Sequence, residues 1–215
     1  MPAGAKKAVA PDKGRKAAYV MRNREALLRS TQEVLAVKGQ AVTIEDIADH
    51  AQVAVSTIYK HFSDKETLIS ATMLWGFAEW MTQVQSLGDD WTDPLEKLVM
   101  PMRHFVRVTS THPHHAHNMV NFLEITTQFI PVLESELSEH IQELAKAKLL
   151  VCDEPDVAAR NLQAVLLSTV VNQVTDKKAK VEDADASIRV ALKMVGISEA
   201  KARKLTESKI PDIKA

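Results

Sequence analysis

Residues 53–65, with the sequence VAVSTIYKHFSDK, combine a short apolar set with an unusual polar one. Val53, Ile58 and Phe62 are spaced to pack onto neighbouring helices. The other positions include the side chains Ser56, Thr57, Tyr59, Lys60 and His61. This set is too polar for a core helix and too aromatic for an ordinary solvated face. The outward side of this helix is therefore predicted to meet a partner.

A second short helix is predicted just before this stretch, within VTIEDIADHA at residues 42–51. Thr43 is placed to accept a hydrogen bond from the backbone N–H of Asp46, which starts the helix. Ile44 and Ile47 then recur on one face. Because about three residues separate the two helices, they must cross steeply, as in a helix-turn-helix.

The whole chain is predicted to be all-α, because six glycines in 215 residues accompany helical apolar spacing nearly everywhere. Cys152 is the single cysteine, so an intrachain disulfide is excluded. No apolar run reaches the ~18 residues that a membrane span needs, and no signal-peptide core is seen at the N-terminus. We therefore expect a cytoplasmic protein with no membrane association.

The helix-turn-helix stretch resembles the TetR family of bacterial one-component regulators. The resemblance rests on LL…VL…KG…VTIEDIADHAQVAVSTIYKHFSDKETLI and covers roughly residues 20–70. It implies an N-terminal three-helix DNA-binding domain, followed by a larger helical domain that binds an effector and forms a homodimer. Such a protein is expected to bind double-stranded operator DNA, most often as a repressor, and to leave it when a small molecule binds.

These observations divide the chain into four parts. Residues 1–18 are predicted to be a flexible basic arm, since residues 1–30 hold eight Lys/Arg and two Asp/Glu. Residues 19–65 form the predicted DNA-binding domain, and residues 66–197 the effector-binding and dimerisation domain. Residues 198–215 are predicted to be a polar tail. The arm is expected either to follow a DNA groove or to be a solvated segment without a DNA role.

The predicted DNA contacts follow from carrying the family pattern onto this sequence. Short side chains at the start of the reading helix face base edges, and longer or charged ones reach phosphates. The predicted contacts are Thr43, Val55, Ser56, Thr57, Tyr59, Lys60, His61 and Lys65. Two positions depart from the family: Gln52 stands where a turn glycine is usual, and Ala54 where a capping serine is common. The first is expected to place a side chain at positive φ.

Candidates for the other two functions lie further along the chain. The predicted effector-lining residues are Trp75, Met102, Phe105, Met119 and Phe122, which suit an apolar or aromatic small molecule. Apolar stripes on two helices predict a dimer interface. Its predicted residues are Leu162, Val165, Leu166, Thr169, Val174, Ile188 and Leu192. Burial of the same stripes within one subunit is the alternative.

Five histidines raise the question of a metal: His104, His112, His114, His115 and His117. His114 and His117 share one helical face, but no cysteine lies nearby and the next carboxylate is Glu124. We therefore predict neither a metal nor a cofactor. Without a convincing nucleophile or ligand set, an enzyme is not expected. A helical adaptor that has lost DNA binding remains the alternative to a regulator.

Overall fold

The computed structural model of the chain describes residues 13–88 and 91–213, and all regular structure in those ranges is helical. The α-helices are α1 (Lys13–Lys38), α2 (Ile44–Ala51), α3 (Val55–Tyr59), α4 (Lys65–Gly88), α5 (Pro94–Val106), α6 (Val108–Thr111), α7 (Pro113–Asn121), α8 (Leu123–Thr127), α9 (Ile130–Lys146), α10 (Pro155–Thr175), α11 (Val181–Ala191) and α12 (Glu199–Glu207). Two 3-10 turns complete them, η1 (Gly39–Ala41) and η2 (Leu192–Val195). The predicted all-α class is confirmed.

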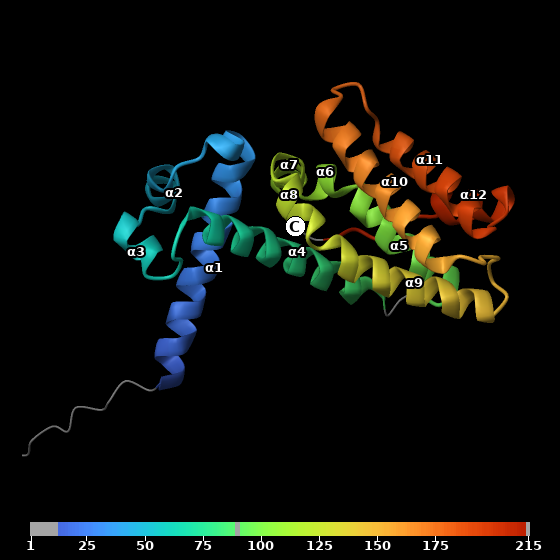
Figure 1. Ribbon diagram of the computed structural model, residues 1–215, viewed down its shortest axis with the longest axis horizontal. Coiled ribbons are helices and arrows are strands. Elements are labelled where there is room, and N and C mark those ends of the chain that lie inside the picture. The colour runs from blue at the N-terminus through green and yellow to red at the C-terminus, as the bar shows by residue number, and fades with distance from the viewer. Residues whose placement is uncertain (1–12, 89–90, 214–215) are drawn as a thin grey trace, which may run out of the picture.

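Helices α1–α3 gather at one end of the molecule and α5–α12 at the other, with α4 running from one to the other (Figure 1). We call α1–α3 the head and α5–α12 the body. One core cluster joins the head to α4 and α7, and includes Leu28, Leu35, Ile47, Ile58 and Leu68. A second cluster lies within the body, between α5 and α9–α12. The chain is thus a small helical domain followed by a larger one, as predicted.

Local signals in the head form as the sequence predicts. Helix α1 ends at Lys38, and Gly39 follows it with a φ of +55°, a conformation that costs glycine little. Thr43 Oγ1 accepts from Asp46 N at 3.1 Å, while Asp46 Oδ2 accepts from Thr43 N at 3.0 Å. This reciprocal pair is a capping box. Lys38 Nζ donates to Asp46 Oδ1 at 2.5 Å, so the end of α1 is tied to the start of α2.

Prolines lie in the first turns of four body helices, α5, α7, α9 and α10. Asp93 caps α5 by accepting from Leu95 N at 2.9 Å, with Pro94 following it at the first helical position. Pro113, Pro131 and Pro155 occupy the first turns of α7, α9 and α10. The segment from Pro113 through Thr127 forms two helices, α7 and α8. It breaks at Phe122, whose φ of −120° and ψ of 49° are not helical.

The N-terminal boundary differs from the prediction. The arm was expected to reach residue 18, but α1 already begins at Lys13. Residues 15–18 (Arg-Lys-Ala-Ala) all have high helix propensity, which outweighs the basic composition that suggested an arm. Residues 1–12 of the predicted arm lie outside the described residues.

The polar tail predicted at residues 198–215 is wrong. Ser198 caps α12, and Ala202, Leu205 and Thr206 are buried on one face of that helix. Beyond it, Ile213 is buried in the cluster that also holds the head. Charged residues at most of the intervening positions concealed this narrow apolar stripe.

A buried charge cluster attaches α12 to the body. Arg103, 3% exposed, donates from Nε to Asp185 Oδ1 at 3.0 Å and from Nη1 to the carbonyl oxygens of Leu205 and Ser208. Arg107 also pairs with Asp185. Burial raises the pKa of Asp185, but hydrogen bonds from Arg107 and Arg103 outweigh it and hold that pKa below its usual value. One side chain of α5 thereby fixes the last helix.

None of the helices in the described ranges is long and apolar enough to cross a membrane.

Candidate functional site

The turn between α2 and α3 has the geometry that the sequence predicts. Gln52 adopts a φ of 54° and a ψ of 44°, the left-handed conformation usually held by glycine. Its N–H and that of Val53 return to the last turn of α2, with Val53 N 3.0 Å from Ala48 O. Ala54 stands at the N-cap of α3 without a side-chain cap. Neither departure from the family pattern prevents the helix-turn-helix from forming.

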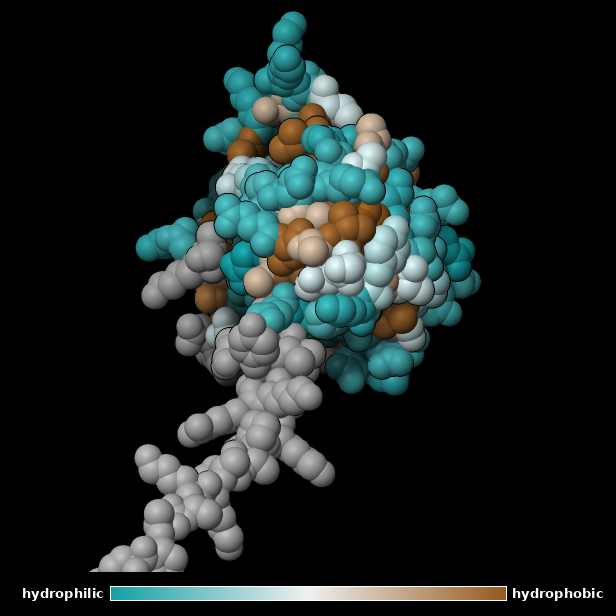
Figure 2. All heavy atoms as spheres, turned by 90° about the vertical axis from the view of Figure 1, so that its left-hand side faces the viewer, coloured by the Kyte–Doolittle hydropathy of each residue, from teal (hydrophilic) through white to brown (hydrophobic). Residues whose placement is uncertain are grey.

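Helix α3 is anchored on its inner side and exposed on its outer side. Ile58 is fully buried and Phe62 is 4% exposed, with the Arg24 guanidinium 5.3 Å from the Phe62 ring centroid. Ser56, Lys60 and Tyr59 are exposed. Val55, Thr57 and His61 are half-buried beside them. Viewed from the head end, the surface is mainly hydrophilic, with hydrophobic side chains gathered near its centre (Figure 2). The predicted base-facing residues thus lie together on an accessible surface.

Thr43 and Lys65 lie at the two ends of the same region. Thr43 is exposed, and because its oxygen accepts from Asp46 N, its hydroxyl hydrogen is free to donate to a phosphate. Hydrogen bonding to Lys38 and Thr43 lowers the pKa of Asp46 to about 2. Lys65 is half-buried, and its Nζ donates to Val42 O at 3.2 Å. It thereby links the first residue of α4 to the segment before α2.

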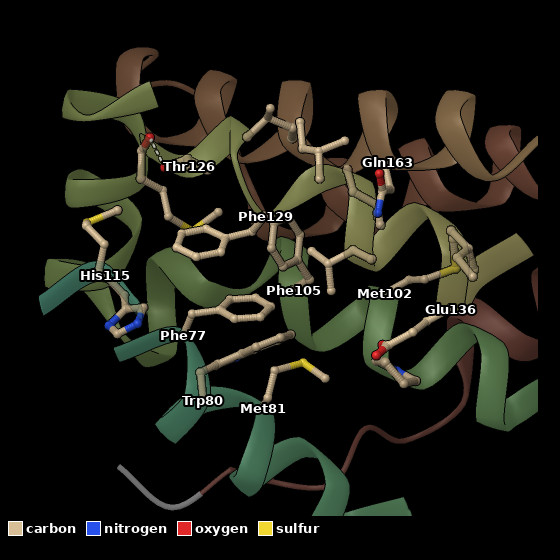
Figure 3. Close-up of a pocket in the computed structure, with 18 of the residues that line it drawn as sticks. Phe77, Trp80, Met81, Met102, Phe105, His115, Thr126, Phe129, Glu136 and Gln163 are labelled. Carbon is tan, nitrogen blue, oxygen red and sulfur yellow. Dashed lines mark hydrogen bonds between the residues drawn. The ribbon is translucent and has the colours of Figure 1, made fainter. Parts of the chain in front are cut away.

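A cavity of about 300 Å³ lies between the head and the body. Its walls come from α1, α4, α5, α7, α8, α9 and α10. Four aromatic side chains, Phe77, Trp80, Phe105 and Phe129, form the middle section, where Phe77 and Phe129 stack at 5.9 Å between ring centroids (Figure 3). This volume is at the lower end of the range of about 300–1,000 Å³ for small-molecule sites.

Three of the five predicted lining residues border this cavity: Met102, Phe105 and Met119. Trp75 and Phe122 do not border it, so that part of the prediction is wrong. Trp75 packs on the other side of α4, where the Arg29 guanidinium lies 5.6 Å from its ring centroid. Phe122 sits at the break between α7 and α8 and is buried in the core. A spacing pattern identifies a helix's apolar face without showing whether that face meets a cavity or another helix.

Sequence reasoning missed the polar part of the lining. Its members are Gln32, Thr72, Lys97, His115, Asn118, Thr126, Glu136, His140 and Gln163. The apolar lining residues Trp80 and Met81 were also not foreseen. Phe77 and Phe129 carried the right residue type, but most of the polar members look like ordinary surface residues in the sequence. Gln32 belongs to α1, so the head itself contributes to the cavity wall.

A polar cluster closes the head end of the cavity. His115 Nδ1 accepts from Gln32 Nε2, and Asn118 Nδ2 donates to the backbone oxygen of Gln32 at 2.9 Å. Gly76 on α4 leaves room for this contact, because a Cβ there would overlap the His115 ring. The cluster therefore joins α1, α4 and α7 at one place.

The histidines do not assemble into a metal site. Among the described residues, no three His, Cys, Asp or Glu side chains converge. His114 and His117 are exposed, and His117 Nδ1 lies 2.8 Å from Pro113 O. Burial lowers the pKa of His115 to about 4, with nearby His112 contributing. His104, packed beside Trp91, likewise has its pKa lowered to about 4, by burial and by Arg107 and Arg103.

The predicted dimer residues fall mostly inside one chain. Leu162, Ile188 and Leu192 are fully buried in the body core, so they have no surface left to give to a partner. Leu166 and Thr169 are each 9% exposed, and Leu166 borders the cavity. Val165 and Val174 are half-buried. For the three fully buried residues the prediction is wrong, and their apolar stripe is intrachain core.

Comparison with known proteins identifies a family model that matches the head. Residues 27–72 match the family model described as bacterial regulatory proteins, tetR family. Residues 27–72 therefore carry a DNA-binding domain of the TetR type. This match spans the end of α1, all of α2 and α3 and the start of α4.

Two curated repressors are similar to this chain over 86 and 77 residues. The HTH-type transcriptional repressor KstR2 of Mycobacterium tuberculosis is 34% identical over 86 residues, which cover 39% of this chain and 42% of KstR2. KstR2 of Mycolicibacterium smegmatis is 36% identical over 77 residues, covering 35% and 37%. The chain thus matches less than half the length of these curated relatives.

Solved structures share the whole fold at low identity. RolR in complex with resorcinol superposes with a TM-score of 0.71 at 19% identity, covering 92% of this chain and 100% of RolR. FadR from Bacillus subtilis in complex with stearoyl-CoA gives a TM-score of 0.62 at 19% identity, covering 81% and 99%. At this identity the likeness shows a shared fold.

Proposed function

We propose that this chain is a ligand-responsive transcriptional repressor. It binds a palindromic operator as a homodimer and is released when a small molecule occupies the cavity. The observation that carries the proposal is the pairing of two sites in one chain: an exposed, firmly anchored reading helix and a separate apolar cavity. The family whose model matches the head consists of regulators, and this supports regulation over catalysis.

The reading helix supports DNA binding rather than an adaptor role. An adaptor reading depended on Gln52 and Ala54 disturbing the turn, but α3 keeps its anchors Ile58 and Phe62. Val55, Ser56 and Thr57 are assigned to base edges in the major groove. Thr43, Tyr59, Lys60 and His61 are assigned to phosphates, which set position and supply salt-dependent affinity. Lys65 is kept as a weaker phosphate candidate, because its Nζ already donates to Val42 O.

Coupling between the two sites is proposed to run through α4 and α1. Helix α4 lines the cavity with Thr72, Met73, Phe77, Trp80 and Met81, and its first residue is bonded to the head. Gln32 brings α1 into the same wall. A ligand that shifts these helices would change the positions of the two reading helices in the dimer. Such coupling is typically worth about 1–3 kcal/mol.

The dimer is proposed to form through the outward sides of α10 and α11. These helices pack side by side at the outside of the body (Figure 1). Val157 on α10 and Val190 on α11 are 45% and 62% exposed, and Met194 in the following turn η2 is 44% exposed. A two-fold dimer would present two reading helices to half-sites about 34–36 Å apart.

Gel shifts with DNA from either side of the protein's own coding region test this function. We expect a discrete complex with one fragment that survives competitor DNA and weakens with salt. The control is Lys60→Ala, which should weaken the complex without altering the oligomeric state. Absence of sequence-specific binding at every salt concentration, with a dimer retained, would favour the adaptor.

A further inference from the structure

The cavity carries information about the chemistry of its ligand. Three residues that line the cavity each hold a buried polar atom with no hydrogen-bond partner within the described chain: Asn118 Oδ1, Trp80 Nε1 and Gln163 Oε1. A buried polar atom without a partner is costly, so such atoms on a cavity wall indicate where a ligand's polar groups belong.

Asn118 is the most informative of the three. Its side chain is 1% exposed, and Nδ2 donates to Gln32 O at 2.9 Å. That bond fixes which end of the amide is nitrogen, since a backbone oxygen accepts only from a donor. The remaining atom, Oδ1, must therefore be an acceptor. It requires a group that donates.

Trp80 Nε1 is a hydrogen-bond donor, whereas Asn118 Oδ1 is an acceptor. Trp80 is 5% exposed and its indole nitrogen can only donate. A ligand that satisfies both atoms must donate and accept. A hydroxyl group does both, whereas a carboxylate only accepts and would oppose Asn118 Oδ1.

The charges on the lining also argue against an anion. Its titratable side chains are Lys97, Glu136, His115 and His140. Lys97 and Glu136 are both exposed and of opposite sign, and Glu136 lies at the far end of the cavity from His115 (Figure 3). Burial lowers the pKa of His115 and of His140, so both are neutral near pH 7. The inner end thus has no cation to balance a buried negative charge.

We propose that the cavity takes an uncharged, mostly apolar molecule whose hydroxyl group donates a hydrogen bond to Asn118 Oδ1. The aromatic middle section, Phe77, Trp80, Phe105 and Phe129, holds the apolar part. This assignment rests on the proposed effector-binding role of the cavity. Because the Asn118 amide is anchored to Gln32, the ligand's hydroxyl group is placed one side chain away from α1.

Calorimetric titration of the full chain with three matched probes tests the assignment: β-naphthol, its methyl ether and β-naphthoate. We expect β-naphthol to bind about tenfold more tightly than the ether, which leaves Asn118 Oδ1 unsatisfied. The naphthoate should bind more weakly than both. Equal binding of naphthol and ether, tightest binding by the naphthoate, or no binding by any probe at about 1 mM would overturn the proposal.

Two variants locate the contact. Asn118→Leu should bind naphthol and ether equally, while Gln163→Leu, at the opposite end of the cavity, should keep the preference for naphthol. A preference that survives Asn118→Leu would overturn the assignment to Asn118. If that variant does not fold, the comparison of the three probes on the unaltered chain decides. The calorimetric titrations need no DNA. A negative titration therefore does not contradict the DNA-binding proposal, and a negative gel shift does not contradict the proposed ligand contact.

Discussion

The head and the cavity bring their functional side chains together in opposite ways. In the head, most of the proposed DNA contacts come from one short stretch on and just after α3, held by Ile58 and Phe62. Around the cavity, the lining comes from seven helices that span the chain from Gln32 to Leu167. A surface built from one helix depends on that helix's anchors, whereas a cavity built from seven depends on how all of them pack.

The largest predicted effect would separate the stability of the body from that of the head. Arg103→Met should cost about 3 kcal/mol, because it removes the donor to Asp185, Leu205 O and Ser208 O from a buried site. Hydrogen exchange should show α12 losing protection while α2 keeps it. Arg203→Met, an exposed arginine on α12, is the matched control and should change stability by less than about 0.5 kcal/mol. Equal loss of protection in α2 and α12 would mean that head and body unfold as one unit.

Acid should weaken the body through His104. Burial lowers the pKa of His104 to about 4, with Arg107 and Arg103 contributing. As the pH falls below about 6.5, this histidine therefore becomes protonated in the unfolded chain while it stays neutral in the folded one. The corresponding stability is complete above about pH 6.5 and is lost as the pH falls toward 4, by roughly 3 kcal/mol.

Urea unfolding at several pH values measures this loss. His104→Phe should reduce the dependence of the unfolding free energy on pH between pH 6.5 and 4. Part of the dependence will remain, because the pKa values of His115, His112 and His140 are also lowered. His114→Phe, at an exposed position, should leave the dependence unchanged. An identical slope in both variants would remove His104 as a cause.

Lys60→Ala should affect the head's function alone. We expect operator affinity to fall about tenfold and the salt slope to decrease by about one, because one phosphate contact is lost. Fluorescence anisotropy at several salt concentrations gives both quantities. Lys177→Ala, an exposed lysine of the body, is the control and should change neither. A fall in affinity with an unchanged slope would assign Lys60 to a base rather than a phosphate.

The smallest predicted effect concerns the turn. Gln52→Gly should stabilise the protein by about 1 kcal/mol, because glycine adopts a φ of 54° without the Cβ penalty. Thermal unfolding measures it. A lower melting temperature in Gln52→Gly would show that the glutamine side chain makes compensating contacts in the turn.

The sequence predicted those parts of the structure whose signals are local. Thr43, Gly39, Asp93 and Pro155 mark helix ends by their own backbone chemistry, and the helix predicted to start at Thr43 does so. The turn at Gln52 was predicted for the same reason.

The cavity and the core depended on packing that no local pattern specifies. Leu162 and Leu192 have a helical spacing that suits a dimer interface, but both lie in the core of the body. Trp75 is an aromatic residue that suits a cavity wall, but it packs against Arg29 on the side of α4 away from the cavity. Asn118 and Gln32 meet although 86 residues separate them. Such a pair becomes visible only when α1 and α7 are placed side by side.

The hydrogen bond from Lys65 to Val42 O has a mechanical consequence. It fastens the first residue of α4 to the segment that precedes α2, so a displacement of this end of α4 acts directly on the head. At 24 residues, α4 is about 36 Å long at 1.5 Å per residue. The cavity-lining residues of α4, from Thr72 to Met81, lie about 10–24 Å from Lys65 along the helix, so a tilt of about 5° in that section would displace Lys65 by about 1–2 Å. In the proposed mechanism, small rearrangements around a ligand reach the reading helix by this path.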